Sequence, residues 1–413
     1  MPSDADVVER VFEDFLNGPK IFANRDALRP DFVPNRFPHR EDQLRRVAGI
    51  IAPVIAGQRG SNLFVYGQTG TGKTAIVRFV LERLEERVKL DGLRTNTCYI
   101  NCRVAGTEYR VLAALGRSLG VDVPFTGLAT AEVLSRFRLT LENQKRFLVA
   151  ALDEVDSLVK VHGDVFLYQL TRFNEGLRNG RLSIVGISND LRFKERLDPR
   201  VLSSLSEEEV VFKPYTAPEI QDILGDRAKL AFVSGALEAS ALGLCAAEAA
   251  GEHGDARRAL DLLRVAGEVA EREGDRAVSD VHVKKAQRKI EEDRVSTVLG
   301  SMPLHSRFVL WGAYLVSKTK TDSAVTGDLY EVYAELCKQS TVEPLTQRRV
   351  SSLINELDLL GLVNARLVNR GRYGRTKKVS LGVPWTLLAE IYEDDPWINP
   401  LLNYVPNCLK TRR

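Results

Sequence analysis

The residues with the clearest chemical potential form one continuous run, Gly67-Gln68-Thr69-Gly70-Thr71-Gly72-Lys73-Thr74. Glycines let backbone N–H groups turn inward and surround phosphate oxygens. Lys73 is long enough to reach β- and γ-phosphates, and Thr74 can bind Mg²⁺ through its hydroxyl group. A strand-like apolar run precedes these residues and a helix-like pattern follows them, which is the context of a phosphate-binding loop. The run therefore predicts a nucleotide site, against the alternative of a surface turn rich in Gly and Thr.

Two adjacent carboxylates, Asp153 and Glu154, follow the apolar run 146–152. Ligands of open α/β sheets bind beyond the carboxyl ends of the strands, where this pair is predicted to lie. We expect Asp153 to hold Mg²⁺, directly or through water, and Glu154 to orient and polarise an attacking water molecule. The alternative for the pair alone is a solvated turn, but the phosphate-binding loop upstream favours the functional interpretation.

Two further polar residues are candidates for phosphate contacts. Asn189 follows the apolar run 182–187, where a neutral amide can hydrogen-bond a γ-phosphate or a water molecule; a turn-forming Asn is the alternative. Arg257 stands at the start of an amphipathic helix and could point at phosphate from a separate lid, or could be a solvated surface Arg. The Pro-rich arm 24–46 lies just upstream of the loop, so we expect it to cross the nucleotide base, with a plain linker as the alternative.

The elements that must position these residues alternate between strand-like and helix-like segments. Strands alternating with helices predict a parallel α/β sheet with right-handed crossovers. After Tyr215 the composition becomes helical as far as about Lys289, and Thr216 with Glu219 three residues later predicts a capping box. The predicted fold class is α/β, a phosphate-binding parallel sheet with a helical lid.

A different pattern begins near residue 294. Three helical segments, 304–317, 327–339 and 346–360, precede two strand-like segments at 361–368 and 377–381. This order predicts a C-terminal winged-helix domain, which is a helix-turn-helix variant. The third helix is apolar on one face, so its polar residues fall on the opposite face or its flank. The residues of this helix predicted to contact DNA are Arg348, Arg349, Ser352 and Asn355.

The turn between the two strands is basic, and no Asp or Glu occurs from Gly361 to Ala389. Such a tip fits contacts with phosphates and grooves, while a solvated charged hairpin is the alternative. The Arg-bearing helix upstream favours DNA, with Arg348 the better candidate for base edges and the wing residues for phosphates or a minor groove. The predicted contacts of the wing are Arg370, Arg372, Tyr373, Arg375, Lys377 and Lys378.

Length and composition set the outer limits. The 413 residues predict two or three domains, which we expect at 1–215, 216–293 and 294–413. The five cysteines include no CxxC pair, which argues for a reducing compartment and against structural zinc. The apolar runs are too short and too mixed to span a bilayer. We therefore expect a cytoplasmic, nucleoid-associated protein with no membrane partner.

The motifs in combination resemble AAA+ ATPases of the replication-initiator branch. The match rests on the phosphate-binding run, the acidic strand 148–156, Asn189 and the segment 254–260, and it is sharpened by 36–44, 197–201 and 214–219. The chain is most similar to archaeal Orc-type initiators, which are related to eukaryotic origin recognition subunits and the cell division control loader. The resemblance covers roughly residues 15 to 400.

The resemblance implies roles for individual residues around the nucleotide. Asn189 corresponds to sensor 1 and Arg257 to sensor 2. Tyr215 is expected to pack near the adenine and Arg227 to contact the nucleotide. The arm, including Val33, Pro34 and Arg40, should border the base.

The resemblance also bears on DNA and on subunit contacts. The helices between Arg103 and Glu142 occupy the place of the initiator-specific insertion, which can touch DNA in this family. Many AAA+ relatives carry an arginine finger near 201–205, but this chain has Ser203 and Ser204 there and only Arg200 nearby. The sequence therefore leaves open whether Arg200 or another residue acts as an arginine finger that completes ATP hydrolysis in a neighbouring subunit.

We interpret the chain as an ATP-dependent replication initiator that binds double-stranded origin DNA, with slow ATP hydrolysis as a switch. The expected cofactors are ATP or ADP and Mg²⁺. The family implies recruitment or loading of the replicative helicase, and a second initiator subunit on DNA is a further expected partner. The main alternative is a nucleotide-switched winged-helix transcription regulator. A clamp-loader-type motor would need an arginine finger and a C-terminal collar that the sequence does not show.

Overall fold

The computed structural model describes residues 20–124, 127–205, 207–251, 254–319, 324–369 and 375–410, together with Glu9, Phe12 and Glu13. Its internal contacts divide the chain into two compact units, 1–287 and 288–413. Helix α13 (Asp280–Ser301) runs across this division in the sequence. Within the described parts of the chain, no helix is both long and apolar enough to cross a membrane.

The first unit contains a sheet of five parallel strands in the order β2-β3-β4-β1-β5. Because all five strands run the same way, their carboxyl ends meet at one edge of the sheet. Asp153 is the last residue of β3, Ser188 the last of β4 and Gly67 the last of β1, so this edge gathers the predicted site. The strands are β1 (Leu63–Gly67), β2 (Thr95–Asn101), β3 (Phe147–Asp153), β4 (Arg181–Ser188) and β5 (Glu208–Phe212).

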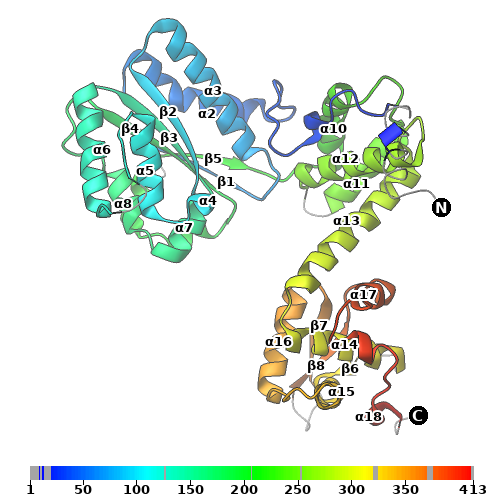
Figure 1. The fold of residues 1–413 in the computed structure, drawn as a ribbon. Coiled ribbons are helices and arrows are strands. Elements are labelled where there is room, and N and C mark those ends of the chain that lie inside the picture. The colour runs from blue at the N-terminus through cyan, green and yellow to red at the C-terminus, as the bar shows by residue number, and fades with distance from the viewer. Residues whose placement is uncertain are drawn as a thin grey trace. The chain divides into compact units, whose positions relative to one another are not determined.

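Helices cover both faces of this sheet, since its three central strands β3, β4 and β1 are apolar on both sides. On β3, Leu148 and Ala150 pack into one core, whereas Val149 and Ala151 pack into the other. Figure 1 shows α2 and α3 on one face, and α5, α6 and α8 on the other. The helices of this part are α2 (Glu41–Ile51), α3 (Lys73–Asp91), α4 (Cys102–Ala105), α5 (Glu108–Ser118), α6 (Thr130–Gln144), α7 (Val155–His162), α8 (Val165–Thr171) and α9 (Pro199–Leu205), with 3-10 turns η1 (Arg25–Leu28), η2 (Ala52–Ala56) and η3 (Phe193–Arg196).

A helical lid follows the sheet within the same unit. It consists of α10 (Ala217–Ala231), α11 (Ala239–Gly251), α12 (Ala256–Glu273) and the first turns of α13. The Glu219 carboxylate accepts hydrogen bonds from the Thr216 N–H at 2.7 Å and the Thr216 hydroxyl at 2.9 Å, which confirms the capping box predicted at the start of α10. The segment just before the arm packs on this lid, where Phe22 stacks on Phe232 with ring centroids 5.0 Å apart.

The second unit is a winged-helix fold. Its three-stranded antiparallel sheet has the order β6-β8-β7, and Trp311, Tyr333 and Tyr392 are among the largest side chains of its core. Its elements are α14 (Leu304–Thr319), β6 (Ala324–Val325), α15 (Thr326–Gln339), α16 (Gln347–Leu359), β7 (Val363–Asn369), β8 (Arg375–Leu381), α17 (Trp385–Tyr392), η5 (Asn399–Leu401) and α18 (Asn407–Lys410).

The structure confirms the predicted fold class, a parallel α/β sheet with a helical lid and a C-terminal winged helix. Two differences have local causes. The sequence also predicts a helix from about residue 39 to about residue 55, but the α-helix ends at Ile51 and the chain continues as η2, because Pro53 cannot donate an α-helical hydrogen bond. The two-residue strand β6 was not predicted, since two residues carry no periodic pattern. The predicted boundaries 215/216 and 293/294 fall just before α10 and inside α13, and they stay predictions.

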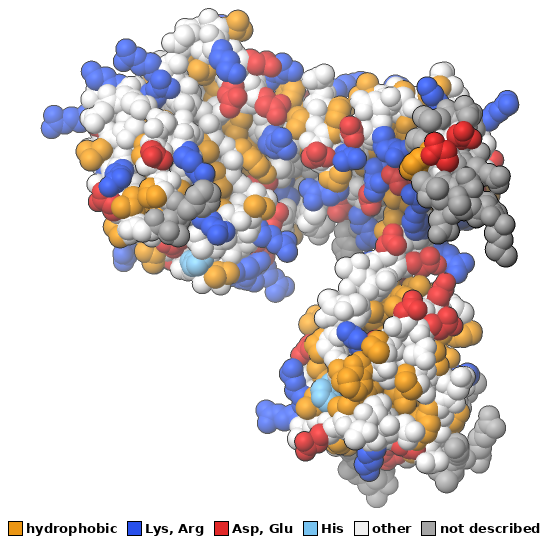
Figure 2. Space-filling model, viewed as in Figure 1, with side chains coloured by type: hydrophobic (Ala, Val, Ile, Leu, Met, Phe, Trp, Pro, Cys, Tyr) orange, Lys and Arg blue, Asp and Glu red, His pale blue; other side chains and the backbone are white. Residues whose placement is uncertain are grey.

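Charged side chains of both signs are interspersed over the visible face of the first unit (Figure 2). This distribution agrees with the small net charge of +3, and that face carries no extended patch of a single sign.

Candidate nucleotide-binding and DNA-binding sites

The loop between β1 and α3 carries the predicted phosphate-binding run. Gly70 and Gly72 have φ of +73° and +93°, a region that residues with a Cβ rarely adopt. A Cβ on Gly70 would lie 1.6 Å from Oδ1 of Asp255, and the Gly70 carbonyl accepts a hydrogen bond from the Ala256 N–H at 3.3 Å. The glycine is thus required both for the turn and for the close approach of the lid to the loop.

Lys73 begins α3 and is only 4% exposed. Its ammonium donates hydrogen bonds to the carbonyl oxygens of Gly67 at 3.0 Å and Gln68 at 2.7 Å. Burial lowers the pKa of Lys73 to about 8, and the nearby Asp153 carboxylate opposes part of this shift. The loop therefore holds a buried cation whose charge a phosphate group would stabilise.

This low pKa predicts that nucleotide affinity falls as the pH rises. The free protein loses the Lys73 proton near pH 8, whereas a bound triphosphate favours the protonated form. The nucleotide affinity should therefore be at its maximum below that pH, and it should fall above that pH by at most about tenfold per pH unit. Titration with a fluorescent ADP analogue between about pH 6.5 and about pH 9.5 measures this slope. A Lys73→Arg variant that still binds should give a flat profile, because a guanidinium stays charged; a flat profile in the parent protein would contradict the assignment.

The Asp153 carboxylate is buried at 3% exposure and lies directly beside the loop. Its Oδ2 accepts hydrogen bonds from the Thr74 hydroxyl and the Tyr99 hydroxyl, each at 2.7 Å, and its Oδ1 accepts from the Glu154 N–H at 2.8 Å. A carboxylate and a threonine hydroxyl in contact are the oxygen ligands that Mg²⁺ prefers, so these two residues fit the predicted metal site.

The Glu154 side chain has different neighbours from those of Asp153. Its backbone has φ of +51°, uncommon for a residue with a Cβ, and it precedes the first turn of α7. Its carboxylate accepts a hydrogen bond from the Asn101 amide at 3.3 Å and lies 3.8 Å from the Arg103 guanidinium. The adjacent acids thus contact different groups: Asp153 contacts the Thr74 hydroxyl of the loop, whereas Glu154 contacts Asn101 and Arg103.

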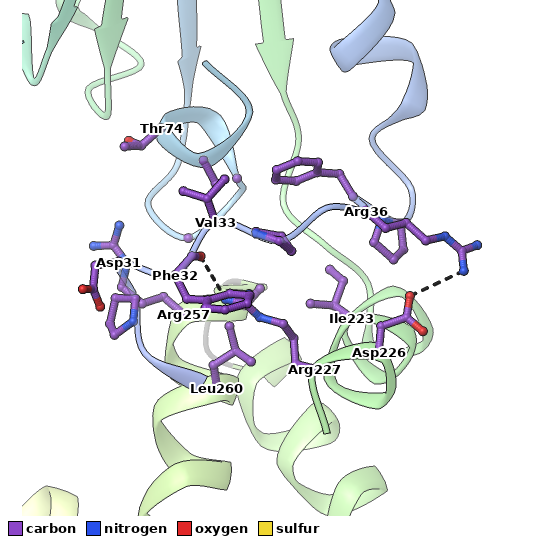
Figure 3. Close-up of a pocket in the computed structure, with 18 of the residues that line it drawn as sticks. Asp31, Phe32, Val33, Arg36, Thr74, Ile223, Asp226, Arg227, Arg257 and Leu260 are labelled. Atoms are coloured by element: carbon purple, nitrogen blue, oxygen red, sulfur yellow. Dashed lines mark hydrogen bonds and ion pairs between the residues drawn. The ribbon is translucent and has the colours of Figure 1, made fainter. Parts of the chain in front are cut away.

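A cavity of about 450 Å³ opens between the loop, the arm and the lid. This volume lies within the range of small-molecule sites, and its lining combines apolar side chains with a few polar groups. Figure 3 shows Thr74 on the loop side, Ile223, Arg227 and Leu260 on the lid side, and Phe32 and Val33 of the arm between them. Its lining includes the apolar residues Phe32, Val33, Pro34, Ile223, Leu230 and Leu260, and the polar or loop residues Gly70, Gly72, Lys73, Thr74, Arg78, Asn189, Tyr215, Asp226, Arg227 and Arg257.

Arg227 shows most directly that this cavity fits a ligand. Its guanidinium lies 4.5 Å from the Phe32 ring centroid and donates one hydrogen bond to the Phe32 carbonyl at 3.3 Å. Its Nη1 is buried without a hydrogen-bond partner among the described residues. Burial lowers the pKa of Arg227 to about 10. Because a buried donor without a partner is costly, an electronegative ligand atom fits here.

Most of the residues predicted to bind nucleotide line this cavity or belong to the loop that borders it. Arg40 is the exception among the predicted residues outside the loop. That side chain is 4% exposed and does not line the cavity. Its guanidinium stacks 3.8 Å from the Tyr215 ring centroid and donates to the carbonyls of Thr71, at 3.1 Å, and Lys213. Arg40 thus connects the loop, at Thr71, with the segment that precedes the lid, at Lys213. The loop residues Gly67, Gln68, Thr69 and Thr71, and the two acids Asp153 and Glu154, also lie outside the lining.

The two predicted sensors reach the cavity from different elements. Asn189 follows β4 and lines the cavity; the preceding Ser188 is held by a 2.9 Å hydrogen bond to Asp156. Arg257 lies in the first turn of α12, which begins where Asp255 accepts hydrogen bonds from the Arg257 and Arg258 N–H groups. Arg200 is exposed on α9 and does not line the cavity.

Several residues of this site were missed by sequence reasoning. Phe32, Arg78 and Asp226 line the cavity, and Tyr99 and Asn101 contact the two acids. Only Asn101 had an available signal, because it is a polar residue at the carboxyl end of a strand, as Asp153 is. The remaining residues carry no motif and reach the site through tertiary packing.

The winged-helix unit presents the predicted DNA residues on α16 and β8. Arg348 is exposed, whereas Arg349 lies 3.5 Å from Glu356, an ion pair that competes with other contacts. Ser352 donates to the Arg348 carbonyl at 3.3 Å. Lys377 of β8 donates to the Asn355 side chain, tying wing to helix. Lys378 is exposed; Arg370, Arg372, Tyr373 and the side chain of Arg375 lie outside the described residues.

Comparison with known families assigns each part of the chain. The family model described as an AAA domain matches residues 56–193, the Cdc6 AAA+ ATPase-type lid domain matches 221–288, and the CDC6 C-terminal winged helix domain matches 297–390. Together these models cover four of the five strands of the sheet and most of the lid and of the winged helix.

Individual relatives are similar over almost the whole chain. The ORC1-type DNA replication protein of Thermococcus onnurineus is 49% identical over 403 residues, which is 97% of each chain. ORC1-type DNA replication protein 1 of Sulfurisphaera tokodaii is 50% identical over 387 residues, covering 94% of this chain and 96% of the relative.

Solved structures agree with these relatives. The Aeropyrum pernix ORC1 protein in complex with DNA is 47% identical, with a TM-score of 0.81 over 92% of this chain and 99% of that chain. The Aeropyrum pernix ORC2 protein, solved as ADPNP–ADP complexes, shares the fold at 22% identity and a TM-score of 0.59 over 92% of this chain and 99% of that chain. The family predicted from the motifs is confirmed: this chain belongs to the archaeal ORC1/Cdc6-type DNA replication proteins, AAA+ proteins with a winged helix.

Proposed function

We propose that the protein binds ATP or ADP with Mg²⁺ in the cavity between loop, arm and lid, and uses the bound nucleotide to control its binding of origin DNA. The observation that carries the nucleotide part is the lining of this cavity, which brings Lys73 of the loop together with Arg227, whose buried Nη1 has no hydrogen-bond partner among the described residues. Cationic groups and apolar walls in one cavity are complementary to a nucleotide, which is anionic at its phosphates and apolar at its base.

Each residue has a proposed task in this site. Lys73 and the loop N–H groups bind phosphate, while Thr74 and Asp153 hold Mg²⁺. When bound, Mg²⁺ neutralises phosphate charge. Asn189 and Arg257 contact the terminal phosphate from the sheet and the lid. Glu154 is the proposed proton acceptor for the attacking water. Its carboxylate contacts Asn101 and not the Thr74 hydroxyl, so it is separate from the proposed metal ligands.

The lid is the proposed transmitter of nucleotide state. Asp255 and Ala256 touch Gly70 of the loop, and Arg257 follows them in the same helix turn. A ligand that contacts both the loop and Arg257 therefore changes the energy of the lid position directly. Slow ATP hydrolysis would make the nucleotide-dependent lid position a switch. The proposed boundaries are 216–293 for the lid and 294–413 for the winged-helix domain.

Origin DNA is the proposed partner of the winged helix. The 47% identical Aeropyrum pernix ORC1 protein was solved in complex with DNA, which supports this proposal. Arg348 is exposed on α16, and the Lys377–Asn355 contact holds the wing strand at that helix. The insertion helices α5 and α6 are a second proposed DNA contact. The replicative helicase and a second initiator subunit are proposed as protein partners.

The DNA part predicts different effects at two positions. Arg348→Ala should cost on the order of 1–3 kcal/mol on the preferred duplex and much less on a scrambled one, if Arg348 reads a guanine edge. Lys378→Ala should weaken both duplexes alike and reduce the log–log salt slope by about 0.9, because a phosphate contact carries no sequence information. Titrations of both duplexes at several salt concentrations measure the two quantities.

The preferred duplex can be found by sequencing genomic DNA that co-purifies with the protein. An Arg288→Ala variant removes a cation that pairs with Glu292 on α13, at 2.8 Å, and serves as the control with parent affinity. If Arg348→Ala weakens both duplexes equally, Arg348 does not read bases. If the bound fragments map to promoters rather than to a replication start, the transcription-regulator alternative holds.

A further inference from the structure

Tyr99 lies on the edge strand of the sheet, and its hydroxyl reaches the buried acid of the neighbouring strand. β2 occupies the end of the strand order, next to β3. The Tyr99 hydroxyl donates a hydrogen bond to Oδ2 of Asp153 at 2.7 Å, across 54 positions of sequence. Asn101, two residues further along β2, contacts Glu154 instead. The side chains of one edge strand thus contact both acids, each through a different residue.

The hydrogen bonds of Asp153 leave little rotational freedom to its carboxylate. Oδ1 accepts from the Glu154 N–H, and Oδ2 accepts from Thr74 and from Tyr99. Of these donors, the Thr74 hydroxyl is itself a proposed Mg²⁺ ligand. The Tyr99 hydroxyl is the side-chain donor to Oδ2 that lies outside the proposed ligand set, so its contact with the metal site runs through the Asp153 carboxylate.

The surroundings of the Tyr99 ring show that packing alone does not hold it. The residue is 37% exposed, and one side of it borders a second cavity of about 360 Å³ beside α4 and α5. The Arg78 guanidinium lies 5.5 Å from the ring centroid, and Arg78 also lines the nucleotide cavity. Tyr99 is therefore not simply a core side chain, because only part of its ring is packed. We infer that its hydrogen bond to Asp153 has a function beyond packing.

We propose that Tyr99 is a positioning residue for the Mg²⁺ site, which holds the Asp153 carboxylate in the orientation that binds the metal. The inference rests on the proposed nucleotide function, because it assigns a supporting residue to the same site. Outer-shell donors to metal-binding carboxylates typically contribute about 10- to 100-fold to metal affinity. Tyr99 does not line the nucleotide cavity, so its removal should spare nucleotide contacts that do not involve the metal.

Tyr99→Phe tests this proposal because it removes the hydroxyl and keeps the ring. Binding of a fluorescent ADP analogue is measured first in EDTA and then as a function of Mg²⁺ concentration. We expect unchanged affinity in EDTA, and about 10- to 100-fold more Mg²⁺ for the half-maximal response. The matched control is Tyr109→Phe, since Tyr109 lines the same second cavity but donates to the Pro124 carbonyl, at 2.5 Å. An unshifted Mg²⁺ response in Tyr99→Phe, or an equal shift in Tyr109→Phe, overturns the proposal.

The Asp153→Asn variant separates this inference from the proposed function. If Asp153→Asn leaves the Mg²⁺ response unchanged, the metal role of Asp153 itself is wrong. If it shifts the response while Tyr99→Phe does not, only the role of Tyr99 fails. When both are correct, the double variant should respond like Asp153→Asn alone, because Tyr99 acts through that carboxylate and the two effects are not additive.

Discussion

Replacement of Glu154 by Gln should reduce ATP hydrolysis by about 10²- to 10⁴-fold, while ATP affinity in Mg²⁺ stays at the parent value. The carboxylate is the proposed proton acceptor for the attacking water, and an amide cannot take that proton. Binding should persist because the loop hydroxyl contacts Asp153 and not Glu154. Gln also keeps an oxygen that can accept the hydrogen bond from the Asn101 amide. Single-turnover phosphate release and equilibrium ATP titration measure the two effects separately.

The controls for this variant use the same chemical change elsewhere. Glu195→Gln alters an exposed carboxylate on η3 and should hydrolyse ATP at the parent rate. Glu154 adopts a positive φ, so melting curves must show that Gln is tolerated there as well as Glu. Hydrolysis at the parent rate in a folded Glu154→Gln protein would place the proton acceptor on another group.

Lys73→Ala should weaken nucleotide binding by about 2–5 kcal/mol, which is roughly 30-fold to several thousandfold. The structure explains why the loss of binding free energy should be large and why some affinity should remain. The Lys73 ammonium is buried against the loop carbonyls, so its loss leaves anionic phosphates without their nearest buried cation. Arg78 and Arg257 also line the cavity, so some attraction for phosphate remains. Equilibrium titration with ATP and with ADP, in the presence of Mg²⁺, measures the loss.

Lys89→Ala is the matched control, because Lys89 lies on the same helix α3 but is exposed near its C-terminal end. It should bind nucleotide with parent affinity. Circular dichroism of both variants shows whether α3 and the sheet remain folded. A folded Lys73→Ala protein with parent affinity for both nucleotides would mean that the phosphates bind elsewhere, and the cavity assignment would be wrong.

The sequence by itself determined the elements whose chemistry is local. A phosphate-binding loop needs glycines for positive φ, a lysine and a hydroxyl within one turn of a helix start, and all of these lie within residues 67–74. The winged helix was likewise predictable, because the apolar period of α16 and the turn after it are properties of neighbouring residues. Strand ends carrying Asp153 and Asn189 could be placed at one edge because parallel strands share their direction.

Only the tertiary structure decided which side chains meet across those elements. Arg40 was predicted to border the base, which stays a prediction; the structure shows that its guanidinium donates hydrogen bonds to the Thr71 and Lys213 carbonyls. The arm brings Phe32 against Arg227, although the two residues are 195 positions apart in the sequence. The Arg227 Nη1 is buried there without a hydrogen-bond partner among the described residues. Tyr99 reaches Asp153 because β2 pairs with β3 in a register that opposes Tyr99 to Ala151 and Asn101 to Asp153. Strand order, register and the path of the arm result from burial of many apolar residues at once, and no short stretch of sequence contains that information.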